Sequence, residues 1–68
     1  MLSKNLARLQ AERGETNYRL AKIIGVHQSS IANWKSGENV PHPKNLDLLA
    51  EHFGVTIDDL LSDTDTSA

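Results

Sequence analysis

Residues 17–37, NYRLAKIIGVHQSSIANWKSG, decide the fold of this chain. Two short helices that meet at a tight turn need a small residue where they approach, a glycine that can take a positive φ, and an apolar residue just after it. Ala21, Gly25 and Val26 supply these three features in the required order. The stretch therefore predicts two helices packed at an angle across a glycine turn.

The limits of the two helices follow from their caps and their periodicity. Thr16 is a suitable N-cap for the first helix, and an apolar stripe at helical spacing runs from there to Gly25. The second helix is predicted over residues 28–36 and is closed by Gly37.

The second of these helices has an unusual outer face. At about 100° per residue, Ile31 and Trp34 fall on one side and are predicted to be buried. The opposite side carries no charge and consists of Gln28, Ser29, Ala32, Asn33 and Ser36. Amides can pair with adenine in the DNA major groove, serine can donate or accept a hydrogen bond, and an alanine methyl can contact thymine. This face is therefore suited to reading base pairs.

The rest of the chain predicts three more helices, so the fold class is all-α, a compact bundle of five short helices. The first runs over about residues 4–13 with Ser3 as its cap; another begins at Pro43 and ends at Gly54. Thr56 and Asp59 form a capping box for the last helix, which ends at residue 61. We expect one domain over residues 1–61, with residues 62–68 as a disordered tail or the start of a linker.

Composition narrows the function classes. A chain of 68 residues supports one small core, and it has no cysteine, no apolar signal segment and no membrane-spanning run. The net charge of −2 is unevenly distributed, because residues 1–45 have a net charge of +4 and residues 46–68 one of −6. The positively charged part, residues 1–45, would attract a polyanion. We expect a protein of the cytoplasm in a bacterial or phage-infected cell.

The histidines and serines do not predict catalysis or metal binding. His27, His42 and His52 lie on different elements without ligand spacing. Ser29 and Ser30 lie near His27 on a short exposed helix that offers no orienting carboxylate or oxyanion pocket. We therefore expect no enzyme activity, no metal, no cofactor and no small-molecule ligand.

The chain resembles the repressor and Cro family of phages and bacteria, the lambda-repressor-like helix-turn-helix proteins, over about residues 2–61. The residues that carry the resemblance are Leu20, Ala21, Gly25, Val26, Ile31, Trp34, Gly37, Pro41, Leu46, Ala50, Gly54, Val55 and Leu61. The resemblance implies the N-terminal domain of a phage-type repressor, with its helix-turn-helix at about residues 17–36. Such a domain places its third helix in the major groove and reads a twofold operator as a homodimer, formed on DNA or through a further C-terminal domain.

The resemblance also implies roles for individual residues. Bases would be read by Gln28, Ser29 and Asn33, with His27 and Ser30 at the border between base and phosphate. The DNA backbone would be held by Asn17, Lys35, Ser36, Asn39 and Lys44. A second copy would be contacted through Val55, Ile57, Leu60 and Leu61, although these residues could equally close the core over the fourth helix.

Two departures from the family limit this transfer. Many relatives have an acidic residue at the position of Lys35 and a basic residue facing it from the first helix, where this chain has Gln10, so we expect Lys35 to be free to face phosphate. Relatives often have a glutamate at the position of Arg19, so Thr16 is expected to cap its helix alone. The alternative function is a protein-binding module on the same fold, of the antitoxin or anti-repressor type.

Overall fold

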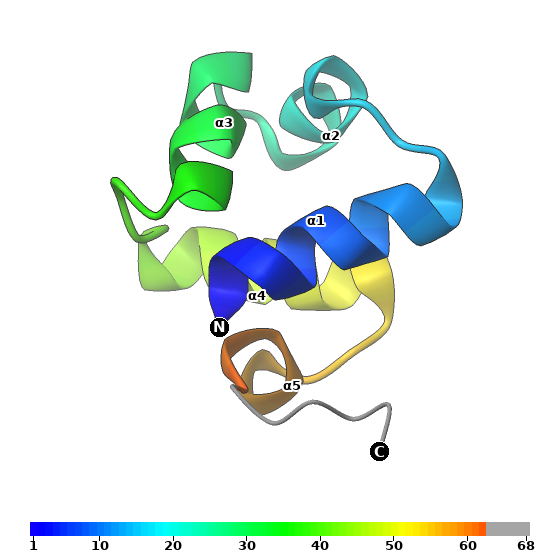
Figure 1. Ribbon diagram of the computed structural model, residues 1–68, viewed down its shortest axis with the longest axis vertical. Coiled ribbons are helices and arrows are strands. Elements are labelled where there is room, and N and C mark those ends of the chain that lie inside the picture. Colours follow the sequence, from blue (N-terminus) through cyan, green and yellow to red (C-terminus); the bar gives the residue numbers. More distant parts are fainter. Residues whose placement is uncertain (63–68) are drawn as a thin grey trace.

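The computed structural model describes residues 1–62 and is all-helical over that range (Figure 1). Its five helices are α1 (Leu2–Arg13), α2 (Asn17–Ile24), α3 (Gln28–Ser36), α4 (Pro43–Phe53) and α5 (Ile57–Leu61). In Figure 1, α2 and α3 form one end of the molecule, α1 and α4 cross its middle, and α5 lies at the other end beside the N-terminus. The predicted all-α bundle of five short helices is confirmed. The tail predicted from residue 62 lies, from residue 63 on, outside the described residues.

The predicted N-caps of α2 and α5 are present, and the predicted starts of α3 and α4 are confirmed. Thr16 Oγ1 accepts a hydrogen bond from the backbone N–H of Arg19 at 3.1 Å, with no acidic side chain helping it. The Thr56 and Asp59 capping box is complete, with both of its bonds present. α3 covers the predicted residues, and α4 begins at Pro43 as predicted. These boundaries could be predicted from the sequence because each depends on a few neighbouring residues.

The start of α1 differs from the prediction. The helix begins at Leu2, its N-cap is Met1 without a side-chain bond, and Ser3 is inside the helix. Contacts with α5 stabilise this early turn: the Asn5 side-chain amide donates to the backbone oxygens of Leu60, at 2.6 Å, and of Ser62, at 2.9 Å. The Met1 ammonium also donates to the Ser62 oxygen. These bonds satisfy backbone oxygens at the C-terminal end of α5 and connect α1 to it, a tertiary contact that no local pattern reveals.

The core draws one fully buried aliphatic residue from each helix. These residues are Leu6, Leu20, Ile31, Leu49 and Leu60. Trp34 and Phe53 are buried beside them, and Val55 and Ile57 are half-buried against the cluster. Leu60 as a contact to a second copy is therefore wrong, because α5 needs this side chain to close its own monomer's core. Leu61, which is 43% exposed, still faces outward.

The turn between α2 and α3 has the predicted construction. Gly25 takes a φ of 89°, and its backbone N–H and that of Val26 both donate to the oxygen of Ala21, at 2.8 and 3.0 Å. A side chain at a positive φ is strained, so glycine is the residue that allows this turn. α3 is thereby packed against both α2 and α1, with Ile31 and Trp34 inward as predicted.

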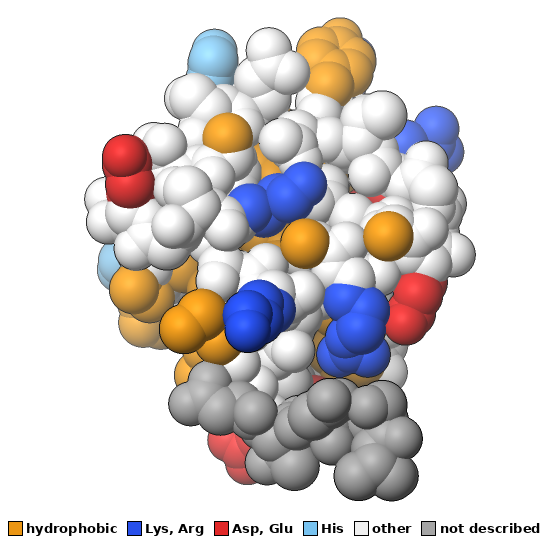
Figure 2. Space-filling model, viewed as in Figure 1, with side chains coloured by type: hydrophobic (Ala, Val, Ile, Leu, Met, Phe, Trp, Pro, Cys, Tyr) orange, Lys and Arg blue, Asp and Glu red, His pale blue; other side chains and the backbone are white. Residues whose placement is uncertain are grey.

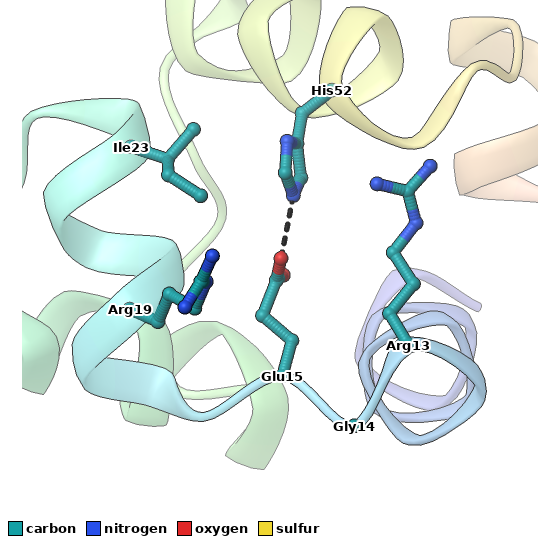
Figure 3. A pocket seen from close by; sticks show the side chains of 6 residues that line it. All are labelled: Arg13, Gly14, Glu15, Arg19, Ile23 and His52. Carbon is teal, nitrogen blue, oxygen red and sulfur yellow. Dashed lines mark hydrogen bonds and ion pairs between the residues drawn. The ribbon is translucent and has the colours of Figure 1, made fainter.

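A buried pair joins the loop before α2 to α4 (Figure 3). His52 Nε2 lies 2.7 Å from Glu15 Oε2, and the Glu15 side chain is only 6% exposed. Arg13 and Arg19 lie on either side of this pair, and the Arg13 guanidinium lies 5.3 Å from the centre of the Phe53 ring. The loop before α2 is therefore attached to α4. No helix among residues 1–62 is long and apolar enough to span a bilayer.

Candidate nucleic-acid interface

The outer face of α3 is free of other parts of the described chain. Gln28, Ser29, Ala32 and Ser36 are exposed, while Ser30 and Asn33 are half-buried. None of these side chains is charged, and they project from a helix whose inner side is fixed by two buried residues. The face therefore has what a major-groove reader needs, namely short polar side chains on a rigid support.

His27 is the N-cap of α3, which constrains how it and Ser29 can bind a ligand. His27 Nδ1 accepts the backbone N–H of Ser29 at 3.1 Å, so this nitrogen carries no proton. The Ser29 hydroxyl lies 2.9 Å from the same nitrogen. In the neutral ring, His27 Nε2 then carries the proton and can donate, while the Ser29 hydroxyl can donate or accept. Two of the predicted base-reading residues are thus in contact with each other.

The predicted backbone-binding residues at the junction of α2 and α3 are linked to each other. Lys35 Nζ donates to Asn17 Oδ1 at 3.0 Å, so Lys35 is not the unattached cation that the sequence predicts. Gln10 Nε2 from α1 donates to the same oxygen at 3.2 Å. Both Asn17 and Lys35 are half-buried. The family's charged pair is therefore replaced by an asparagine that accepts from an amide and a lysine.

The remaining predicted backbone-binding residues line the far end of α3 and the loop after it. The Ser36 hydroxyl donates to the Asn33 backbone oxygen at 3.0 Å, which helps to end α3. Asn39 and Lys44 are exposed, and the backbone N–H of Lys44 donates to His42 Nδ1, the cap of α4. Ser36 directly follows Lys35, which bonds to Asn17, so this group continues from the Asn17 and Lys35 pair at the C-terminal end of α3.

The charge distribution favours an anionic partner at this end of the molecule. α2 and α3 contain Arg19, Lys22 and Lys35 but no Asp or Glu. Figure 2 shows mostly uncharged polar surface where α2 and α3 meet, with Lys and Arg side chains beside and below it. α5 at the opposite end carries Asp58 and Asp59 in its first turn, where they also suit the helix dipole. The electrostatic field of the molecule therefore favours the approach of a polyanion to the end formed by α2 and α3.

Sequence reasoning missed one feature of this surface, the Tyr18 and Lys22 pair, and it missed the burial of Gln10 beneath it. Tyr18, 59% exposed, has the Lys22 ammonium 5.2 Å from its ring centre, and both line a hollow of about 170 Å³ with His27 and Gln28. Their i and i+4 spacing on the outer side of α2 was the available signal. Gln10 is 2% exposed, and its place four residues after Leu6 on the inner stripe of α1 marked it as a polar residue in a core position.

Comparison with known proteins agrees with this geometry. The model of a family described as helix-turn-helix matches residues 6–60. The transcriptional activator BcrR of Enterococcus faecalis is 33% identical over 60 residues, which are 88% of this chain and 29% of BcrR. The cryptic phage CTXphi transcriptional repressor RstR of Vibrio cholerae is 30% identical over 67 residues, 98% of this chain and 60% of RstR. The chain thus spans less than two thirds of either relative.

The fold is also found among solved structures. The SOS-response transcriptional repressor LexA of Eubacterium rectale superimposes with a TM-score of 0.89 at 29% identity, covering 96% of this chain and 69% of that one. The predicted lambda-repressor-like architecture is confirmed.

Proposed function

Since this chain belongs to the Cro/CI-type helix-turn-helix family of transcription regulators, which implies DNA binding, we propose that it is a sequence-specific repressor whose α3 enters the major groove of an operator. The observation that carries the proposal is the uncharged outer face of α3, on which Gln28, Ser29, Ala32 and Ser36 are exposed, in a helix pair that carries cations and no acid. Gln28 and Asn33 supply amides for bases, His27 a ring nitrogen and Ser29 a hydroxyl, with Ser30 at the edge. Occupancy of the operator would then exclude polymerase.

The backbone of the DNA would be held by residues beside the C-terminal end of α3 and at the helix starts of α2 and α4. Asn17 and Lys35 act at the start of α2, where the free N–H groups of a helix N-terminus also favour phosphate. Ser36, Asn39 and Lys44 act from the last residue of α3, the loop after it and the first turn of α4. Such contacts fix the position of the helix without carrying sequence information.

Two copies would bind half-sites about one DNA turn, roughly 34 Å, apart on a twofold operator. A single domain of this size makes few contacts, so pairing would supply the missing affinity. Of the residues predicted to touch the second copy, Leu61 is exposed and Val55 and Ile57 are half-buried, while Leu60 is excluded by its burial. The pairing surface would therefore centre on Leu61.

The test is selection of bound sequences from a random duplex pool at two salt concentrations. The proposal predicts enrichment of one motif with twofold symmetry, and an affinity that falls linearly on a log–log plot of salt. A pool that stays random at both salts would contradict it.

The competing function is a protein-binding module, and a separate observation favours it. Ile23 and Leu48 are exposed and lie together in a hollow between α2 and α4, away from α3. Capture of partners from native lysate with and without nuclease distinguishes the two functions. Partners lost with nuclease are held through nucleic acid, whereas partners retained by the wild type and lost from Ile23→Ser support the module.

A further inference from the structure

Three helices meet on one oxygen atom beside the candidate interface. Asn17 Oδ1, at the start of α2, accepts from Gln10 Nε2 of α1 at 3.2 Å and from Lys35 Nζ of α3 at 3.0 Å. Gln10 is itself 2% exposed, so it cannot reach a ligand directly.

The chemistry of the three groups determines how each is turned. An ammonium group can only donate, so the Asn17 amide must present its oxygen, and not its nitrogen, to Lys35. Gln10 must then present Nε2 to that oxygen, which leaves Gln10 Oε1 buried with no described hydrogen-bond partner. An unpaired buried acceptor is unfavourable, and a leucine in this place would avoid it. Core stability alone therefore does not account for a glutamine here.

The arrangement has a consequence for the outer side of Asn17. The two ends of a planar amide point apart, so an Oδ1 held inward directs Nδ2 away from α1 and α3. No acceptor for Nδ2 is described within residues 1–62. The ammonium of Lys35 has two further protons besides the one that it donates to Asn17 Oδ1. The Asn17 amide and the Lys35 ammonium, joined through this oxygen and both half-buried, thus hold further donors at the start of α2.

We propose that Gln10 is a positioning residue for DNA binding, which orients Asn17 Nδ2 and the Lys35 ammonium as a joint donor set for a single DNA phosphate. The proposal rests on the proposed function. It gives a reason for a glutamine at this position despite the unpaired Gln10 Oε1. It also means that Asn17 fixes the position of the Lys35 ammonium. A purely structural role for Gln10 would affect folding but not the salt dependence of binding.

The test compares three variants on the selected operator duplex and on a shuffled duplex of the same length. Asn17→Asp is isosteric and still accepts from both donors, but it lacks Nδ2 and places a negative charge beside the phosphate. We expect it to keep its thermal midpoint while binding both duplexes about tenfold or more weakly. Gln10→Leu removes the orphaned oxygen, so it should stay folded and yet bind both duplexes about three- to tenfold more weakly.

Gln10→Glu is the most discriminating variant, because its carboxylate draws the Lys35 ammonium inward. The slope of log affinity against log salt should then fall by about 0.9, the value for one phosphate contact. Ala11→Glu is the matched control: it adds the same charge one residue away at an exposed position and should leave the slope unchanged.

The outcomes separate the two proposals. A wild type that binds duplex DNA, with both Gln10 variants equal to it in affinity and salt slope, overturns the positioning role and leaves the DNA-binding function standing. A wild type that binds no duplex overturns the function and this inference with it.

Discussion

Replacing Leu60 by alanine should destabilise the domain strongly, whereas the same change at its neighbour Leu61 should have a much smaller effect. Leu60 is fully buried and Leu61 is 43% exposed, although both are on α5. Comparing the two variants tests whether α5 closes the core of its own monomer or contacts a second copy.

The sizes of the two effects follow from burial. Truncating a buried leucine to alanine removes about three carbon groups at about 0.8 kcal/mol each, and the cavity left behind raises the loss to about 3 kcal/mol. At Leu61 roughly half of the transfer energy applies and the surface can relax, which gives about 1 kcal/mol. A domain of this length has a total stability on the order of 3–9 kcal/mol, so Leu60→Ala removes a large part of it.

Urea unfolding followed by the fluorescence of Trp34 measures both effects. Trp34 is the single tryptophan and is buried, so its emission reports loss of the core. We expect Leu60→Ala to lower the midpoint strongly at unchanged slope, and sedimentation to show the same assembly state for its folded fraction. The reasoning is refuted if Leu60→Ala leaves the midpoint in place, or if Leu61→Ala lowers it more.

Three further predictions concern the interface and the last helix. Gln28→Ala should weaken binding to the selected operator by about 1–3 kcal/mol and leave binding to a shuffled duplex unaffected, as measured by competition binding. Equal weakening on both duplexes would exclude Gln28 from base reading. Lys44→Ala should weaken binding to all duplexes alike and lower the slope of log affinity against log salt by about 0.9. An unchanged slope in a salt titration would show that Lys44 makes no phosphate contact. Thr56→Ala should lower stability by about 1 kcal/mol through loss of the capping box, and a thermal midpoint equal to the wild type would show that the cap is dispensable.

The helices could be read from the sequence wherever their limits depend on neighbouring residues. Thr16, Gly25 and Gly37 marked the limits of α2 and α3 because caps and left-handed glycines act within one turn. The inward side of α3 followed from periodicity, because Ile31 and Trp34 are both large and apolar. The uncharged outer face followed from the same geometry.

Features that depend on contacts distant in sequence could not be read in this way. α1 begins early because Asn5 bonds to backbone more than fifty residues away. The attachment of Lys35 depends on where α2 places Asn17, and the burial of Leu60 depends on how α5 folds back on α1 and α4. His27 was predicted to lie at the border between base and phosphate. Its capping bond to the backbone N–H of Ser29 could not be predicted, because that bond depends on the actual backbone angles.

The central claim is that the outer face of α3 enters the major groove, and the cysteine-free sequence allows a direct measurement. Single-cysteine variants Ser29→Cys and, as a control on α5, Asp58→Cys would be mixed with the selected duplex carrying a thiol tethered to cytosine N4, in the major groove, and the disulfide yield determined. The account predicts rapid linkage of Ser29→Cys and only background linkage of Asp58→Cys. Equal yields from the two variants, or linkage of Ser29→Cys only to a duplex with its thiol in the minor groove, would contradict it.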